Sequence, residues 1–262
     1  MKKLIALLLA LAMTACLFAC GETEQEPTTK PTEAPTEAPT EPSEPSDPSD
    51  PADPDDGIMS YEEYLAAEYE TEVTVICYVQ ANQSWWNGKV RIYAADKEGG
   101  AYFLFDTICE EADAALLTPG TAIKVTGTKI IWDGLIEISE GTFEILKDEA
   151  PFIATPVDLT AKLGTNELSN HMNALATFKG MTVKNIEYKN GAPGDDIYIT
   201  LTKDGKDYNF CVEAYLTTTT PGSTVYETVG TLNAGDVVDV TAFVYWYLDN
   251  PNPHITAISL AQ

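Results

Sequence analysis

A repeated proline-rich, acidic segment divides the chain into a part that cannot pack and a part that can. Residues 21–57 repeat Pro-Thr-Glu-Ala units and then Ser-Glu-Pro and Ser-Asp-Pro units, and they contain no apolar side chain larger than alanine or proline. Such a segment buries too little apolar surface to offset its ordering entropy. Its prolines fix φ at an extended value, and its like charges repel. We therefore expect a disordered stalk here, and packed structure only in residues 58–262.

The first residues of the chain indicate export. Two lysines precede the apolar run Leu4–Met13, whose ten residues are too few for a bilayer-spanning helix of about 20 residues. The sequence Leu-Phe-Ala-Cys-Gly at residues 17–21 then resembles the lipobox of bacterial lipoproteins. The resemblance implies a signal peptide over residues 1–19 and a lipid on Cys20, which would begin the stalk segment 20–57. The Met-Thr-Ala-Cys sequence that ends at Cys16 is a competing lipobox, and an ordinary secretory signal is the alternative.

A lipid on Cys20 would make a membrane the first partner of this chain. Two acyl chains hold a protein on a bilayer where one does not, because each buried methylene contributes about 0.8 kcal/mol. The expected location is the extracytoplasmic face of the cell membrane, at the cell surface. The stalk would hold the folded part away from that surface.

The net charge of −26 is not confined to the stalk. Residues 58–150 hold 17 acidic against six basic side chains, and residues 151–262 hold twelve against six. A protein that binds nucleic acid through its phosphates normally shows the opposite balance, because neutralising phosphates supplies much of the affinity. The charge therefore favours a glycan, peptide or protein partner over nucleic acid.

The residues that usually carry catalysis form no recognisable motif. Cys77, Cys109 and Cys211 follow the signal region at spacings without Cys-x-x-Cys, and a bridge between the first two stays open. The two histidines, His171 and His254, lie outside any His-Glu-x-x-His sequence, and Gly-x-Ser-x-Gly and Gly-x-x-x-x-Gly-Lys do not occur. We therefore expect no metal and no cofactor, and an enzyme is the least favoured class. Chemistry by carboxylates alone would leave no motif.

Hydrophobic periodicity predicts a mainly β fold after residue 57. Ser60 and Glu63 form a capping box ahead of a short helix, and Val73–Val79 alternates apolar and polar residues with the period of a strand. Asn87-Gly88 is typical of a type I′ hairpin turn, because both of its positions need positive φ. The first half is further predicted to hold strands at 89–95, 101–106, 121–129 and 135–146, the last bent near Gly141, and a helix-like interruption at 110–117.

The second half repeats this order with longer connections. It is predicted to hold a helix at 165–173, strands at 174–188 (kinked at Gly180), 195–203, 206–213, 237–247 and 252–260, and an irregular Thr-rich connector at 217–232. The order strand, strand, strand, helix, strand, strand resembles that of the OB-fold, a five-stranded Greek-key barrel. The resemblance implies two tandem OB-fold-like barrels, each with a short helix, over residues 58–150 and 151–262. A β-sandwich is the alternative if the connectors at 110 and 217 are not helical.

The OB-fold resemblance also implies a place for a ligand, on the outer face of strands two and three beside the loops after strands one and four. In the first half this place holds tryptophans, cations and a tyrosine: Trp85, Trp86, Lys89, Arg91, Tyr93 and Trp132. Aromatic rings and cations together can stack on a sugar or on a nucleobase. The alternative is that the tryptophans pack on the barrel and that Arg91 merely pairs with nearby acids. The matching positions of the second half are Tyr198, Thr200 and Thr202.

Together these observations favour a membrane-anchored, non-catalytic binding module for a glycan, peptide or protein partner. A single-stranded nucleic-acid binder is the alternative that the fold resemblance suggests and the charge opposes. A purely structural surface lipoprotein is the third hypothesis. Because the second half lacks tryptophan and arginine at the matching positions, we do not expect the two halves to share a ligand.

Overall fold

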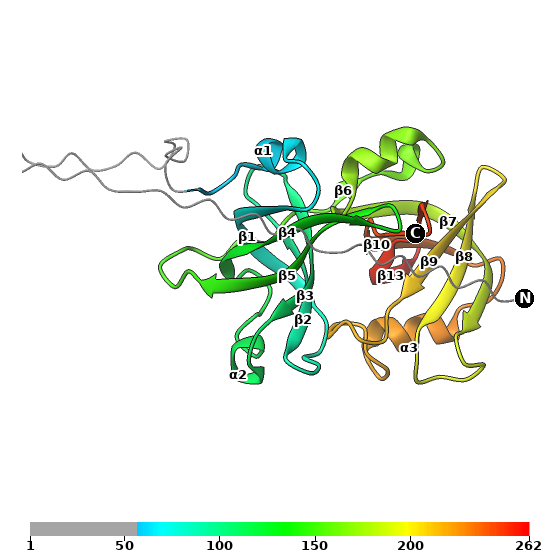
Figure 1. Cartoon of the computed structure of the whole chain (residues 1–262). Helices are drawn as coiled ribbons and strands as arrows, with labels where there is room; N and C mark the ends of the chain where they lie inside the picture. Colours follow the sequence, from blue (N-terminus) through cyan, green and yellow to red (C-terminus); the bar gives the residue numbers. More distant parts are fainter. Residues whose placement is uncertain (1–56, 262) are drawn as a thin grey trace, which may run out of the picture. The chain divides into compact units, whose positions relative to one another are not determined.

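The computed structural model describes residues 57–261. The predicted signal peptide, the predicted lipidation site Cys20 and the stalk lie outside the described residues. The first barrel (barrel 1) contains α1 (Tyr61–Ala66), β1 (Thr71–Asn82), β2 (Lys89–Ala95), β3 (Ala101–Ile108), α2 (Glu111–Ala114), β4 (Ala122–Trp132) and β5 (Leu135–Ile145). Its five strands close in the order β1-β2-β3-β5-β4, in which β3 and β5 are parallel and the other neighbours antiparallel (Figure 1).

Local sequence explains how barrel 1 begins. The Ser60 backbone N–H donates to Glu63 Oε2 at 2.8 Å, and the Glu63 N–H donates to Ser60 Oγ at 3.3 Å, so the predicted capping box is confirmed. In β1 the alternate residues Val73, Val75 and Cys77 are buried in the barrel core, as the period of two predicts. The turn between β1 and β2 has φ of 48° at Asn87 and 81° at the glycine that follows, which is the expected hairpin geometry.

A buried lysine fastens α1 to the barrel. Lys129 on β4 is 1% exposed, and its ammonium donates to the carbonyl oxygens of Leu65 at 2.8 Å and Ala67 at 2.7 Å. Helices leave their last carbonyls unpaired and carry partial negative charge there, so a cation at this end stabilises the helix. The ammonium also lies over the rings of Tyr64 and Tyr69. Burial lowers the pKa of Lys129.

The hairpin of β4 and β5 bends where two glycines meet. A Cβ on Gly127 would lie 2.8 Å from the Gly141 Cα, closer than real side chains approach, so this crossing requires glycine. The pairing of β4 with β5 shifts register between Thr126 and Thr128 at the same place. The predicted bend near Gly141 therefore has a steric cause, and it lets the strands curve into a closed barrel.

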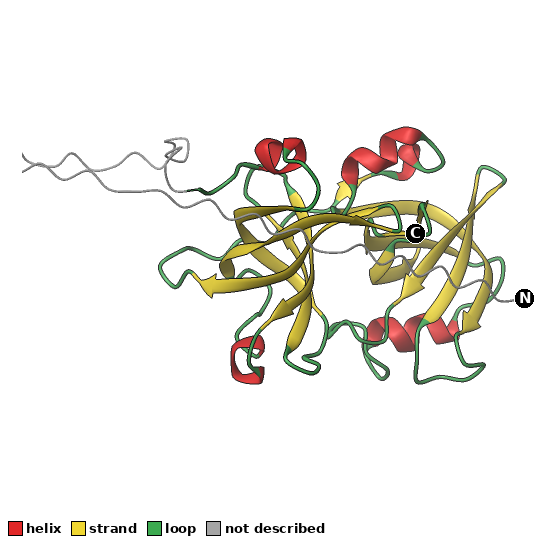
Figure 2. Ribbon diagram, viewed as in Figure 1, coloured by secondary structure: helices red, strands yellow, loops and turns green. Residues whose placement is uncertain are grey.

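The second barrel (barrel 2) repeats the topology of the first. Its elements are β6 (Val157–Asp158), η1 (Thr160–Lys162), η2 (Asn166–His171), β7 (Leu175–Tyr188), β8 (Ile197–Lys203), β9 (Lys206–Val212), α3 (Thr224–Thr231), β10 (Val237–Phe243), β11 (Trp246–Tyr247), β12 (Asn250–Pro251) and β13 (His254–Leu260). The order β7-β8-β9-β13-β10 closes through the pairing of β10 with β7. The short β6 adds a parallel pairing to β7. Figure 2 shows the two sets of strands with their helices; in sequence, α2 lies between β3 and β4, and α3 lies between β9 and β10.

Two connections of barrel 2 differ from the sequence prediction. Residues 166–171 form a 3-10 helix rather than an α-helix, because the segment is short and ends where Asn173 takes a φ of 66°. The connector 217–232 is not irregular throughout, since it contains α3. Ser223 caps this helix by accepting from the Tyr226 N–H at 3.2 Å, and Tyr226 and Val229 bury one face of it. Burial of that face outweighs the low helix propensity of its threonines.

The fold is therefore mainly β and consists of two tandem five-stranded OB-fold-like barrels, each with a short helix between its third and fourth strands. Both sheets close on themselves, so the β-sandwich alternative is wrong. Cys77, Cys109 and Cys211 are all free, which settles the open question of a bridge. Among residues 57–261, none of the helices is both long enough and apolar enough to cross a bilayer.

Aromatic side chains join the two barrels, and all described residues belong to one compact unit. Tyr93 on β2 stacks on Phe243 of β10, with ring centroids 4.1 Å apart and planes at 1°. Phe103 on β3 contacts Tyr245 edge to face at 5.6 Å. Tyr93, Phe103 and Leu135 belong to the same buried cluster as the core of barrel 2. The outer face of β2 and β3, which the OB-fold resemblance assigns to a ligand, is thus partly covered by barrel 2.

Candidate ligand-binding groove

The connection between β1 and β2 forms one side of a groove of about 580 Å³. This volume lies within the range of roughly 300–1,000 Å³ that is usual for small-molecule sites. The groove is lined by Gln83, Ser84, Trp85, Trp86, Asn87, Lys89, Val90, Arg91, Asp106 and Tyr215. Four of the predicted site residues, two tryptophans and two cations, therefore lie around one cavity.

The two adjacent tryptophans have different environments. Trp85 is half-buried, and its indole N–H donates to the carbonyl oxygen of Cys109 at 3.0 Å, which fixes the ring against the segment after β3. Trp86 occupies the first position of the hairpin turn, bonds Lys89 through the backbone at 2.9 and 3.0 Å, and has 80% of its surface exposed. One ring thus forms part of the wall, and the other stands free at the rim.

The cations of the groove share one carboxylate. Arg91 Nε lies 3.0 Å from Asp106 Oδ1, and Lys89 Nζ lies 3.2 Å from Asp106 Oδ2. The Arg91 guanidinium carbon also lies 4.3 Å from the centroid of the Phe105 ring. A stacked and hydrogen-bonded guanidinium has lost most of its freedom before any ligand arrives. The groove therefore presents a fixed arginine, a fixed acid and a lysine side by side.

A segment of barrel 2 completes the opposite wall. Ser84 donates through its backbone N–H to the Tyr215 carbonyl oxygen at 2.9 Å, and Thr217 donates likewise to the Asn82 carbonyl oxygen at 2.9 Å. Gln83 pairs with Leu216 in an antiparallel bridge between these two contacts. The groove consequently contains residues from both barrels, and its shape depends on their attachment.

Behind this wall lies a buried polar network. Gln83 Nε2 donates to Glu213 Oε1, and the other carboxylate oxygen of Glu213 lies 3.1 Å from His254 Nδ1. The same ring nitrogen lies 2.9 Å from the Tyr93 hydroxyl, and the Tyr245 ring stacks on the imidazole at 4.1 Å. Burial raises the pKa of Tyr93 well above its usual value. A side chain of the groove is thus connected to the centre of the contact between the barrels.

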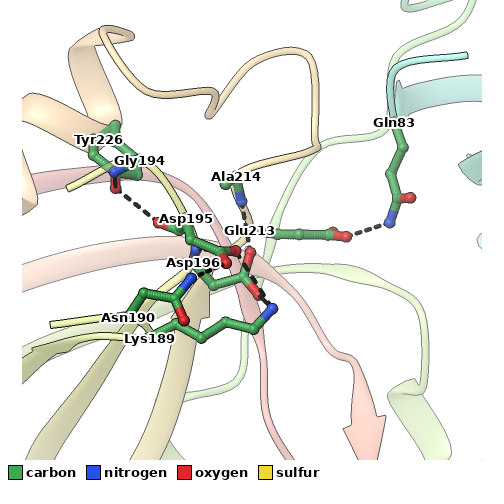
Figure 3. A network of polar contacts seen from close by, with 9 residues as sticks. All are labelled: Gln83, Lys189, Asn190, Gly194, Asp195, Asp196, Glu213, Ala214 and Tyr226. Carbon is green, nitrogen blue, oxygen red and sulfur yellow. Dashed lines mark hydrogen bonds and ion pairs between the residues drawn. The ribbon is translucent and has the colours of Figure 1, made fainter. Parts of the chain in front are cut away.

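Asp196, which pairs with Lys189, also fixes the backbone of Ala214, the residue after Glu213. Lys189 Nζ lies 2.9 Å from Asp196 Oδ2 and 3.4 Å from Asp195 Oδ1, and Asp196 Oδ1 accepts from the Ala214 N–H at 3.0 Å (Figure 3). The acidic pair is therefore a structural element that anchors the chain between β9 and α3. Within residues 57–261, no group of three or more His, Cys, Asp and Glu side chains is arranged to hold a metal ion.

A second buried carboxyl belongs to the covered face of barrel 1. Glu137 on β5 is 2% exposed, and its Oε2 has no hydrogen-bond partner among the described residues. Burial raises the pKa of Glu137 to about 7, with Arg91 acting in the opposite direction and Asp106 adding to the rise. Glu137 in turn contributes to the raised pKa of Tyr245 on the facing barrel, where burial is the main cause.

The structure corrects the sequence expectation for two residues. The Tyr93 side chain does point to the outer face of barrel 1, as the alternation predicts. It is only 1% exposed because barrel 2 covers it, so no ligand can reach its ring. Trp132 is the last residue of β4 rather than a loop residue, and it is not among the residues of the groove. It is 46% exposed and packs at 6.1 Å against Tyr247 of barrel 2.

Sequence reasoning missed six of the ten residues that line the groove, and three of these, Asp106, Gln83 and Tyr215, are instructive. Asp106 could have been found, because an acid that ends the strand beside Lys89 and Arg91 is placed to pair with them. Gln83 gave no signal beyond its position before the tryptophan pair. Tyr215 belongs to a connector of the other barrel, and no local pattern shows that two segments so far apart in sequence pair with each other.

Comparisons with known proteins give no family for this chain. No protein-family model matches it, and no curated protein matches it. Among solved structures, it is similar to a murine DNA-binding protein bound to double-stranded DNA, at 11% identity over 69% of this chain and 90% of that one, with a TM-score of 0.35. It is similar to a replication protein A heterotrimer bound to single-stranded DNA at 13% identity over 71% and 49%, with a TM-score of 0.28. For the S. pombe Stn1–Ten1 complex the identity is 21% over 29% of this chain and 59% of that one, with a TM-score of 0.24.

Proposed function

We propose that this chain is a non-catalytic glycan-binding module, held at the extracytoplasmic face of a membrane by a lipid on Cys20. The observation that carries the proposal is Trp86, whose ring is 80% exposed at the rim of a groove that also contains Trp85 and Arg91. An indole gains a great deal from burial, so one that stands free beside a groove is available to stack on the apolar face of a sugar ring.

The charges of the groove support a sugar over a nucleic acid. Both cations, Lys89 and Arg91, already bind Asp106, so they do not form a strip of uncompensated positive charge. Binding of single strands normally combines stacking with such a strip along the phosphates. Aromatic rings beside an acid and the amides of Gln83 and Asn87 instead match the hydroxyl groups of a sugar.

The test is a binding screen of the mature chain against a glycan array and single-stranded oligonucleotides. We expect glycan binding, and we expect Trp86→Ala to weaken it roughly 5- to 150-fold, if a sugar gains from the ring about the 1–3 kcal/mol that a nucleobase gains by stacking on one aromatic. Trp132→Ala is the matched control, since it removes an exposed indole outside the groove and should leave the affinity unchanged. Binding of oligonucleotides alone, or glycan binding that Trp86→Ala does not alter, would contradict the proposal.

The anchor is a separate part of the proposal, supported by the lipobox resemblance at residues 17–21. Metabolic labelling with a fatty acid should tag the protein, and Cys20→Ser should remove the tag. Cys16→Ser serves as the control and should keep it. Loss of the label in Cys16→Ser instead would assign the lipid to the competing lipobox, and no label in the unaltered protein would exclude the anchor.

A further inference from the structure

The charges in and beside the groove balance one another, because Lys89, Arg91 and Asp106 line the groove and Glu140 lies next to it. Lys89 Nζ lies 3.2 Å from Asp106 Oδ2 and 3.7 Å from Glu140 Oε1, and Arg91 Nε lies 3.0 Å from Asp106 Oδ1. Two cations thus face two carboxylates on a chain whose net charge is −26. A ligand that carries carboxylates or phosphates would meet no net positive charge here, and the field of the whole protein would repel it.

The same side chains keep hydrogen-bonding capacity for a ligand. A carboxylate offers about four lone-pair positions and a guanidinium offers five N–H donors. Asp106 uses one position on each oxygen for its cations, and Arg91 uses its Nε–H on Asp106. Acceptor positions on Asp106 and donors on the terminal nitrogens of Arg91 therefore remain next to each other.

The backbone fixes the position of this pair. Asp106 has a φ of 49°, an uncommon value for a residue other than glycine, and the pairing of β2 with β3 shifts register between Val90 and Ile92. The irregularity interrupts the alternation of β3, which places Asp106 beside Arg91 while Phe105 lies under the guanidinium at 4.3 Å. Because the Phe105 ring supports Arg91 and the backbone fixes Asp106 beside it, the two side chains lose little conformational freedom when they bind a ligand.

From this geometry we infer that the groove selects a neutral sugar with adjacent free hydroxyls, which Asp106 and Arg91 recognise together while Trp86 stacks on the ring. This inference rests on the proposed glycan-binding function. One hydroxyl of such a pair donates to Asp106, and its neighbour accepts from Arg91. An acidic sugar can accept from Arg91, but Asp106 and the negative field of the whole chain oppose its binding.

The inference is tested with matched probes. Isothermal titration of the mature chain against cellohexaose, mannohexaose and xylohexaose is compared with titration against hexagalacturonate, at about 0.1 M and about 1 M salt. We expect binding of at least one neutral oligosaccharide, with an affinity at least tenfold above that for hexagalacturonate and nearly independent of salt, because no net charge is neutralised.

Substitution of the acid should reverse the preference. Asp106→Asn keeps the size of the side chain and tolerates the positive φ, but it loses a charged acceptor, releases Arg91 and leaves Lys89 with Glu140 alone. We expect neutral binding to weaken roughly 10- to 100-fold and hexagalacturonate binding to strengthen, with a new dependence on salt. Asp207→Asn, which breaks an ion pair with Lys184 on barrel 2, is the matched control and should change neither. A thermal melt of each variant confirms that it is folded.

The outcomes separate this inference from the proposed function. If the unaltered chain prefers hexagalacturonate and Trp86→Ala abolishes that binding, the groove binds glycans but the assignment to neutral sugars is wrong. If Asp106→Asn folds and binds the neutral sugar as well as the unaltered chain does, Asp106 is not a recognition residue. If neither the neutral nor the acidic oligosaccharides nor a glycan array binds, both the proposed function and this inference are wrong.

Discussion

The two barrels share one strand order but use the outer face of their second and third strands in opposite ways. In barrel 1 this face holds Tyr93, Phe103 and Phe105, and the first two are buried against barrel 2. In barrel 2 the matching positions are Tyr198, which is 40% exposed, and two threonines: Thr200 donates to Asn209 at 3.3 Å, and Thr202 donates to Asp207 at 2.9 Å. Identical topology thus gives an attachment surface in one copy and a hydrated surface in the other.

The difference shows that side chains, rather than topology, decide which part of an OB-fold-like face stays open. Exposure of several aromatic side chains to water is unfavourable, so covering this face with barrel 2 stabilises both barrels. The covered area ends between Tyr93 and Arg91, two residues apart on β2. Beyond that boundary, Lys89, Arg91 and the tryptophan pair remain accessible, and the groove lies there.

The largest difference between the two faces is expected at Tyr93. Tyr93→Ala removes the stacking on Phe243 and the contact with His254, and we expect it to lower the free energy of unfolding by about 3–5 kcal/mol. Tyr198→Ala, on the matching face of barrel 2, removes a side chain that is 40% exposed and should change it by less than about 1 kcal/mol. Urea denaturation measures both. Equal losses would mean that the two faces are not used differently.

The buried carboxyl on the covered side gives a smaller effect than Tyr93, and this effect depends on pH. Burial raises the pKa of Glu137 from 4.5 to about 7, so the folded state holds a proton that the unfolded chain releases within this window. Stability that is present below pH 4.5 is therefore lost as the pH rises through 7. Glu137→Gln cannot ionise, and we expect it to remove this pH dependence and to be more stable above pH 7 by about 1–2 kcal/mol.

Denaturation in urea at about pH 5 and about pH 8 measures this effect. Glu144→Gln is the matched control, because Glu144 lies on the same strand and is exposed. The control should keep the pH dependence of the unaltered chain. If Glu137→Gln keeps it as well, the Glu137 carboxyl is not the group that titrates.

Sequence patterns predicted most of the fold because they are local. The capping box at Ser60, the turn at Asn87 and the alternation of β1 each involve residues within a few positions of one another. The 3-10 helix at 166–171 and α3 were not predicted correctly from local sequence. Whether such a segment forms an α-helix, a 3-10 helix or coil depends on which of its side chains the rest of the protein buries. Repetition of the element order in the two halves compensated for weak local signals.

The site was predicted less completely because its limits depend on contacts between distant segments. Alternation places Tyr93 on the outer face, but nothing near it in the sequence shows that Phe243 covers that face. The OB-fold resemblance predicts that Trp132 lies in a ligand-binding loop, but the residue ends β4 and packs against Tyr247 of the other barrel. Covering of a surface by a second domain is a property of the whole chain.

The two adjacent tryptophans of barrel 1 should contribute differently to its stability. Trp85→Ala removes a half-buried ring and its hydrogen bond to Cys109, and we expect a loss of about 1–3 kcal/mol in the free energy of unfolding. Trp86→Ala should change stability by less than about 0.5 kcal/mol, since the ring is 80% exposed. Thermal and urea denaturation of both variants provide the test. Strong destabilisation by both would mean that Trp86 packs in solution and is not available to a ligand.

The smallest effect is expected at the ion pair on the open face of barrel 2. Lys184 and Thr202 hold the pKa of Asp207 below its usual range, so the stabilisation is present at neutral pH and is lost as the pH falls. Both partners are about half exposed, with 57% and 45% of their side-chain surfaces in solvent, and water and salt therefore screen the attraction. We expect Asp207→Asn to leave the melting temperature at neutral pH nearly unchanged. Asp106→Asn should lower it further, because Asp106 is 26% exposed and its loss removes the ion pair of Arg91 and leaves Lys89 with Glu140 alone. A larger shift for Asp207→Asn than for Asp106→Asn would show that the polar face of barrel 2 is an organised surface, and the contrast between the two faces would then be wrong.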